Sequence, residues 1–103
     1  MSESAEHNPT MARLQALAAE TRRRLPAEWL AKARHVRRLR PGERWPAWST
    51  GELLAVALIV GDDEQLAAMD YTQTEALDRL RYEIGEPSVE AAAAVFADLR
   101  AQL

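Results

Sequence analysis

Apolar residues recur at intervals of three or four along most of this chain, which is the period of one face of an α-helix. Leu14, Leu17 and Ala18 begin the pattern and predict a helix that starts at Thr10. Pro26 interrupts it, because proline lacks the N–H donor that a helix interior needs. We therefore expect a first helix that ends before Pro26 and a second helix that begins there.

The second predicted helix has the sequence PAEWLAKARHVRRL and separates its residues onto two faces. Trp29, Ala33 and Val36 share one face, whereas Arg34 and Arg38 share another. This pattern is typical of a helix that packs its apolar face on a core and exposes a basic outer face. The segment RPGERWPAW, rich in Pro and Gly, then predicts a loop whose tryptophans pin it to the core.

The next segment, STGELLAVALIV, contains the longest apolar run of the chain. Ser49 and Glu52 have the S-x-x-E spacing of a capping box, which marks a helix start. Gly61 stands where such a helix would end. Because the run is apolar nearly all round, we expect the helix at about 50–60 to be the buried centre of the fold.

The remainder of the chain predicts further short helices. The segment DDEQLAAM begins with three acids, which favour a helix N-terminus through the helix dipole. Thr72 and Glu75 repeat the capping-box spacing, and Pro87 and Ser88 suit the start of the last helix. No segment alternates apolar and polar residues for long enough to predict a strand.

These elements together predict an all-α fold, a compact bundle of about five or six short helices around the buried central helix. Residues 1–9 are polar and end at a proline, so we expect a disordered N-terminal tail. Residues 10–103 would form a single helical domain, since the chain is too short for two. Its N-terminal helices, at 10–40, are basic, and its helical core, at 49–103, is acidic.

The stretch LAAMDYTQTEALDRL, at residues 66–80, resembles the ubiquitin-associated type of three-helix module. The signature of that family runs Leu-x-x-Met-Gly-Tyr and then an Ala flanked by acids. Asp70 stands where the family has Gly, at the position where that Gly lets the loop approach a partner closely. The matching residues are Leu66, Met69, Tyr71, Glu75, Ala76 and Leu80.

The same stretch also approximates a helix-turn-helix, with Ala67, a turn near Tyr71, and apolar anchors at Leu77 and Leu80. Its second helix mixes acids with arginines, whereas a helix that faces phosphates is normally basic on its exposed side. More widely, residues 25–103 resemble uncharacterised small helical proteins of actinobacteria and their phages. That resemblance implies a phage- or prophage-linked origin and supplies no residue roles.

Composition excludes several kinds of chemistry and location. The chain has no cysteine, which rules out disulfides, thiolate metal sites and thiol nucleophiles. Its longest apolar run, of eight residues, is too short to span a bilayer. The N-terminal sequence MSESAEHNPT lacks the basic start and apolar stretch of a signal peptide. We therefore expect a soluble cytoplasmic protein without a membrane contact.

Catalytic machinery is not visible in the sequence. The two histidines, His7 and His35, stand in the expected tail and on an Arg-rich helix face, and no nucleophile–base pair or phosphate loop appears. The acids at 62–64 lack the ligand spacing of a calcium loop and are better explained as a helix start. We expect no enzyme activity, no metal, no cofactor and no small-molecule substrate.

Charge is divided unevenly, although the net charge is only −3. Residues 1–44 carry ten Lys/Arg against five Asp/Glu, and residues 45–103 carry three against eleven. Either the basic half meets an outside polyanion, or the two halves pair with each other within one chain or across a dimer. The sequence leaves both interpretations open.

The Arg-rich segment 22–44 and the neighbouring tryptophans therefore predict a contact surface. Our leading hypothesis is a non-enzymatic regulatory or adaptor protein that acts by protein–protein interaction, with another protein or by self-association. The alternative is a small nucleic-acid-binding regulator that uses the same arginines. The expected contact residues are Arg34, Arg37, Arg38, Arg40, Arg44, Trp45 and Trp48.

Overall fold

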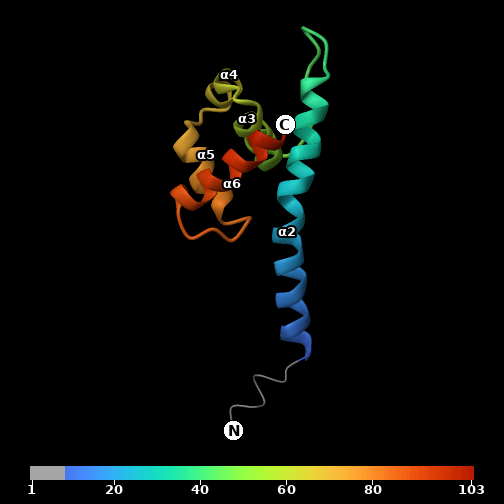
Figure 1. Ribbon diagram of the computed structural model, residues 1–103, viewed down its shortest axis with the longest axis vertical. Helices are drawn as coiled ribbons and strands as arrows, with labels where there is room; N and C mark the ends of the chain where they lie inside the picture. The colour runs from blue at the N-terminus through green and yellow to red at the C-terminus, as the bar shows by residue number, and fades with distance from the viewer. Residues whose placement is uncertain (1–8) are drawn as a thin grey trace.

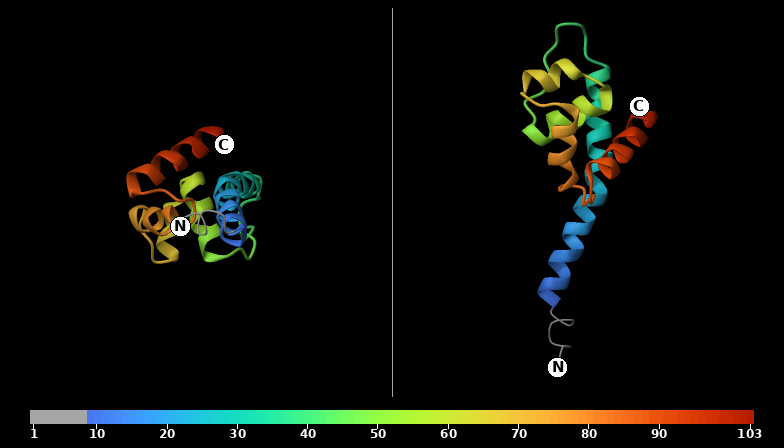
Figure 2. Two further views of the ribbon diagram at one scale, coloured as in Figure 1. Left: turned by 90° about the horizontal axis from the view of Figure 1, so that it is seen from below. Right: turned by 90° about the vertical axis from the view of Figure 1, so that its left-hand side faces the viewer.

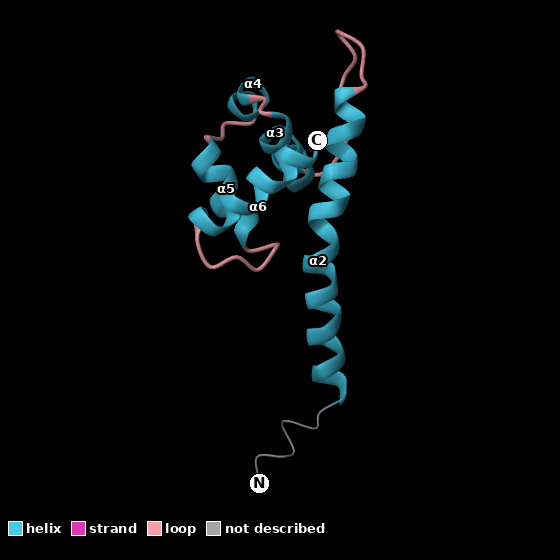
Figure 3. Ribbon diagram, in the orientation of Figure 1, coloured by secondary structure: helices cyan, strands magenta, loops and turns pink. Residues whose placement is uncertain are grey.

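The computed structural model describes residues 9–103, and every regular element in that range is a helix (Figures 1 and 3). This confirms the predicted all-α bundle. The expected N-terminal tail lies outside the described residues, except for Pro9, which opens the first described helix. The helices are α2 (Pro9–Arg37), α3 (Thr50–Val60), α4 (Asp63–Ala68), α5 (Gln73–Arg81) and α6 (Val89–Gln102).

Helix α2 is one continuous helix of 29 residues, so the predicted break at Pro26 is wrong. An interior proline costs about 3 kcal/mol, chiefly because one backbone hydrogen bond is lost. On one side of Pro26 the helix is held by the burial of Trp29 and Ala33 in the core. On the other side the chain is rich in Ala, Leu and Arg, which are strong helix formers. The helix also begins at Pro9, so the predicted start at Thr10 lies inside it.

Helix α3 is the buried centre of the bundle, as the sequence predicts. All six residues from Leu54 to Ile59 are buried, and the helix packs against α2, α4, α5 and α6. The predicted capping box is present, because the Glu52 N–H donates to Ser49 Oγ at 3.2 Å and the Ser49 N–H donates to Glu52 Oε1 at 3.0 Å. Gly61 ends the helix with a φ of 75°, a left-handed conformation that favours glycine.

Helices α4, α5 and α6 cover the other side of α3. Each begins at a residue that the sequence marks as a cap or a neighbour of one. The Asp62 carboxylate accepts from the Gln65 N–H, the Thr72 and Glu75 side chains form a second capping box, and the Ser88 hydroxyl accepts from Ala91. The N-terminus of each short helix is therefore set by a local capping hydrogen bond.

The N-terminal part of α2 extends beyond the bundle (Figures 1 and 2). Residues 9–24, which we call the arm, are exposed apart from the half-buried Ala19. The protein is consequently elongated, with dimensions of 62 × 24 × 23 Å. Across residues 9–103, no helix combines the length and the apolar composition that crossing a membrane requires.

Candidate partner-binding surface

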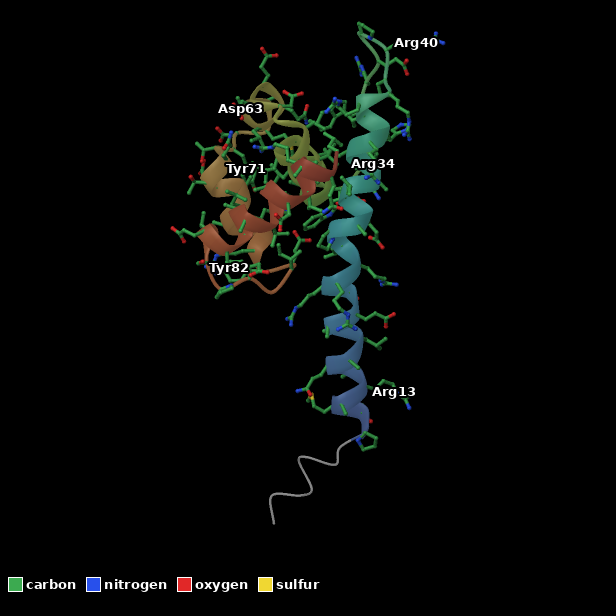
Figure 4. The ribbon with its side chains drawn as sticks, in the orientation of Figure 1. Arg13, Arg34, Arg40, Asp63, Tyr71 and Tyr82 are labelled. Atoms are coloured by element: carbon green, nitrogen blue, oxygen red, sulfur yellow. The ribbon has the colours of Figure 1, made fainter. Side chains whose placement is uncertain are left out.

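The predicted contact residues lie at the C-terminal end of α2 and in the loop that follows it. The structure gives them different surroundings. The Arg34 guanidinium donates through Nη2 to the backbone carbonyl of Gln102 at 3.0 Å (Figure 4). Because a helix C-terminus carries partial negative charge, this contact satisfies Arg34 within the protein. Arg34 therefore fastens α2 to the end of α6.

Arg40 lies at the outer end of the loop and makes a local contact with Glu43 (Figure 4). Its backbone N–H donates to Glu43 Oε1 at 3.0 Å, and its Nε lies 4.0 Å from the same oxygen. The Arg40 side chain is 90% exposed, and an exposed pair of this kind contributes little to stability. The guanidinium remains accessible to a partner.

Arg37, Arg38 and Arg44 are all exposed. Among residues 9–103, none of the three has a carboxylate within ion-pair distance, and none donates a side-chain hydrogen bond. We call these three residues the unpaired arginines. Their charges are not neutralised by the acidic half of the described chain.

Trp45 and Trp48 are half-buried and pack against the core, which confirms that they seat the loop. The Trp48 ring meets the His35 ring edge-on, with ring centroids 6.2 Å apart, and Lys32 Nζ lies 5.8 Å from the Trp48 centroid. These contacts hold Trp48 against α2. Trp45 has a different position, because part of its ring faces an open groove.

The groove has a volume of about 470 Å³ and runs between the end of α2 and the turn from α3 into α4. One wall combines Arg37 with apolar surface, and the other is acidic. Asp63 lies on the acidic wall, where its Oδ1 accepts from Gln73 Nε2 at 2.8 Å (Figure 4). We call this feature the mixed-charge groove. Its lining residues are Val36, Arg37, Trp45, Val60, Gly61, Asp62, Asp63 and Glu64.

Arg37 and Trp45 are among the contact residues that the sequence predicts, whereas the acidic wall is not. The acids at 62–64 are explained locally as a helix start, and Asp62 does cap α4. Their position opposite Arg37 depends on how the α3–α4 turn packs beside the end of α2. No local pattern in the sequence carries that information.

The two oppositely charged halves of the chain pair with each other at one place within residues 9–103. Lys32 Nζ lies 3.1 Å from Glu52 Oε2, whereas the other two ion pairs each join residues of the same half. The Ser49 backbone N–H lowers the pKa of Glu52, and the Ser49 hydroxyl and Lys32 lower it further. Pairing within one chain thus accounts for little of the charge asymmetry.

Helices α4 and α5, with the turn between them, contain the residues that resemble a ubiquitin-associated module. Leu66, Ala76 and Leu80 are buried, so they act as core residues. Asp70 has a φ of 64°, and it is the one non-glycine residue with positive φ in the described range. Asp70 thus adopts a backbone conformation that favours glycine, the residue the family has there. The resemblance itself stays a prediction.

Comparison with known proteins gives no relative: no protein-family model matches the chain, and neither a curated protein nor a solved structure matches it. The described residues also contain no group of three or more His, Asp or Glu side chains arranged to hold a metal ion. The interpretation of the surface therefore depends on its own geometry and charge.

Proposed function

We propose that this protein is a small non-enzymatic adaptor or regulator that binds another protein through the mixed-charge groove and the unpaired arginines beside it. One observation carries the proposal. Arg37, Arg38 and Arg44 are exposed without a carboxylate partner among the described residues, whereas Arg34 donates to the Gln102 carbonyl and Arg40 has a long, exposed contact with Glu43. Exposed charge that a protein leaves uncompensated is available to steer and orient a complementary partner.

The groove indicates the chemistry of that partner. Trp45, Val36 and Val60 offer apolar surface, Arg37 offers a bidentate donor for a carboxylate, and Asp63 and Glu64 offer acceptors for a cation. A protein segment with an apolar anchor between an acidic and a basic side chain would satisfy both walls. The unpaired arginines that lie outside the groove would extend the contact to further acids of the same partner.

The acidic wall also favours a protein over a nucleic acid as the partner of the groove. A phosphate chain that reached Arg37 would pass beside Asp62, Asp63 and Glu64, and these carboxylates would repel it. The net charge of −3 adds to that repulsion. The alternative hypothesis of a nucleic-acid-binding regulator therefore fits the mixed-charge groove less well.

The proposal is tested by reversing the charge of the unpaired arginines. The variant combines Arg37→Glu, Arg38→Glu and Arg44→Glu, and the matched control keeps the positive charge at the same positions with Arg37→Lys, Arg38→Lys and Arg44→Lys. Partners recovered from lysate of the source cell are quantified by mass spectrometry. We expect the first variant to lose a partner that wild type and control both retain. Equal recovery by the first variant would contradict the proposed surface.

Nucleic-acid binding is tested separately with labelled duplex and single-stranded DNA by fluorescence anisotropy, at salt concentrations of about 0.05 and 0.2 M. We expect no binding at either concentration. Binding that weakens steeply with salt and disappears in the variant of the unpaired arginines would replace the adaptor proposal with the nucleic-acid alternative.

A further inference from the structure

Leu14 and Leu17 form an apolar ridge on the arm. Their side chains are 56% and 53% exposed, and they share one side of the helix because they are three residues apart. Within residues 9–103 the exposed large apolar residues are these two, Met11 and Tyr82. Most of the exposed large apolar surface of the described chain is therefore concentrated on the arm.

The bundle of the same chain does not cover this ridge. The N-terminal turns of the arm lie beyond the other helices in both side views (Figures 1 and 2), and the arm meets the bundle only at its base, where the Arg22 side chain lies beside Gly85. At 3.6 residues per turn, the ridge also points roughly a third of a turn away from the face on which Trp29 and Ala33 pack. Helices in proteins gain most of their stability from packing an apolar face, and the ridge has no such contact within its own chain. The ridge is thus placed to be covered by another molecule.

The bundle carries a groove that suits such a ridge. It lies between α5 and α6, has a volume of about 120 Å³, and has Leu58, Leu77 and Phe96 among its lining residues. Ala93 and Ala97 also line it, and their small side chains allow a second helix to approach closely. A groove of this shape accepts an aliphatic side chain from a helix laid across it.

The arm and the region around the α5–α6 groove also carry opposite charges. The arm carries four arginines and one glutamate, whereas residues 61–103 carry ten acids and three arginines. Glu90 lies on α6 one turn before the groove residue Ala93, and it is exposed without an ion-pair partner among the described residues. Arg100, the one cation that lines the groove, is already engaged, because its Nη2 donates to the Leu58 carbonyl at 2.6 Å.

We propose that the arm of one copy docks its Leu14–Leu17 ridge into the α5–α6 groove of a second copy, with the arginines of the arm near Glu90 of α6. Each copy has one arm and one groove, so exchange of the two arms closes a two-fold dimer. This contact uses none of the unpaired arginines and leaves the mixed-charge groove open. The dimer would then present that groove twice.

The first test changes the arm. Sedimentation velocity over a range of concentrations should show the wild-type protein as a dimer. The double variant Leu14→Glu/Leu17→Glu should raise the dissociation constant about a hundredfold or more, because each of the two contacts loses two apolar anchors. The matched control, Ala12→Glu/Ala16→Glu, adds the same charges on the opposite side of the arm and should dimerise like wild type.

The second test changes the groove. Ala97→Arg places a long cation in the groove and should also abolish the dimer, whereas Ala94→Arg, on the exposed side of α6, should not. These positions are exposed, so circular dichroism should report the same helix content in all variants. The proposal requires that the arm variant and the groove variant both lose the dimer, because the arm and the groove form the two sides of one contact.

Mixing the two defective chains distinguishes docking of arm on groove from pairing of arm with arm. A chain with Leu14→Glu/Leu17→Glu keeps its groove, and a chain with Ala97→Arg keeps its arm. The mixture should form a heterodimer through one intact contact, although each chain alone is monomeric. A dimer that Ala97→Arg leaves intact would overturn the proposal, and so would a wild-type protein that stays monomeric at its highest soluble concentration.

Discussion

The indole ring of Trp29 stacks on the phenyl ring of Phe96, with ring centroids 5.7 Å apart and ring planes inclined by 15°. Both side chains are only 2% exposed. The pair joins α2 to α6, and the hydrogen bond from Arg34 to Gln102 adds a second link between the same two helices. Because α2 carries both the arm and the end of the mixed-charge groove, this junction positions every surface proposed to bind a partner.

The first prediction concerns this aromatic junction. Phe96→Ala should lower the free energy of unfolding by about 3–5 kcal/mol, because it removes a fully buried ring and leaves a cavity beside Trp29. The measurement is urea denaturation followed by tryptophan fluorescence and circular dichroism. Ala94→Ser, on the exposed side of the same helix, should change stability by less than about 0.5 kcal/mol. A loss below about 1 kcal/mol for Phe96→Ala would show that the junction is not a main support of the bundle.

The second prediction concerns the proline within α2. Pro26→Ala restores the backbone N–H that can donate to the Arg22 carbonyl and should stabilise α2 by about 1–3 kcal/mol. Hydrogen exchange of the backbone amides at residues 22–30 should slow accordingly. Ala27→Gly, at the adjacent position, should speed it, since glycine costs about 1 kcal/mol in a helix. Unchanged exchange rates in Pro26→Ala would mean that the missing hydrogen bond at Pro26 does not limit the stability of the helix there.

The third prediction concerns the dependence of stability on pH at Glu52. Its pKa is lowered from the ordinary 4.5 mainly by the Ser49 backbone N–H, with Lys32 contributing, so the ionised form favours the folded state. That stabilisation is complete above the ordinary pKa and is lost as the pH falls through the lower pKa of the folded protein.

Glu52→Gln tests this, because glutamine can keep the cap hydrogen bond but has no charge. At neutral pH the wild type should be more stable than the variant by roughly 0.2–1 kcal/mol, the range of an exposed ion pair. The difference should shrink toward zero as the pH is lowered from 6 to about 3. A difference in unfolding free energy that stays constant over that interval would contradict the assignment.

The fourth prediction concerns the turn at Asp70, whose φ is 64°. A β-branched residue is strongly disfavoured there, so Asp70→Val should cost about 1–2 kcal/mol of unfolding free energy. Asp70→Gly removes the steric strain at Cβ but raises the conformational entropy of the unfolded chain. These two effects on the unfolding free energy should cancel to within about 1 kcal/mol. Thermal and urea denaturation measure both. Equal losses for the two variants would show that backbone conformation does not decide this position.

Local hydrogen bonding explains why most helix boundaries are readable in the sequence. The capping boxes at Ser49 and Thr72 form as predicted, and Gly61 ends α3 in the left-handed conformation. These signals involve residues a few positions apart, so no long-range contact is needed to interpret them. Pro26 is the exception. Proline disfavours a helix interior, but the burial of Trp29 and the strong helix formers before Pro26 favour a continuous helix. A rule based on proline alone does not compare these free-energy contributions.

The sequence predicts only part of the candidate site. The sequence predicts one role for five arginines and two tryptophans, but in the structure Arg34 binds the end of α6 and Trp48 packs the loop against α2. Which guanidinium groups remain unpaired depends on which backbone carbonyls and carboxylates the fold brings within reach. The acidic wall opposite Arg37 and the groove that Ala97 lines arise in the same way, from the packing of separate helices against each other.

The sequence by itself determined the helical class, the positions of the caps and the burial of α3, because the period of apolar residues and the hydrogen bonds of helix ends are properties of short segments. Tertiary structure alone decided that α2 runs unbroken past Pro26, that its first turns project from the bundle, and which arginines stay unpaired. Those outcomes depend on packing and on charge distances between separate segments, which periodicity and spacing within a short window do not report.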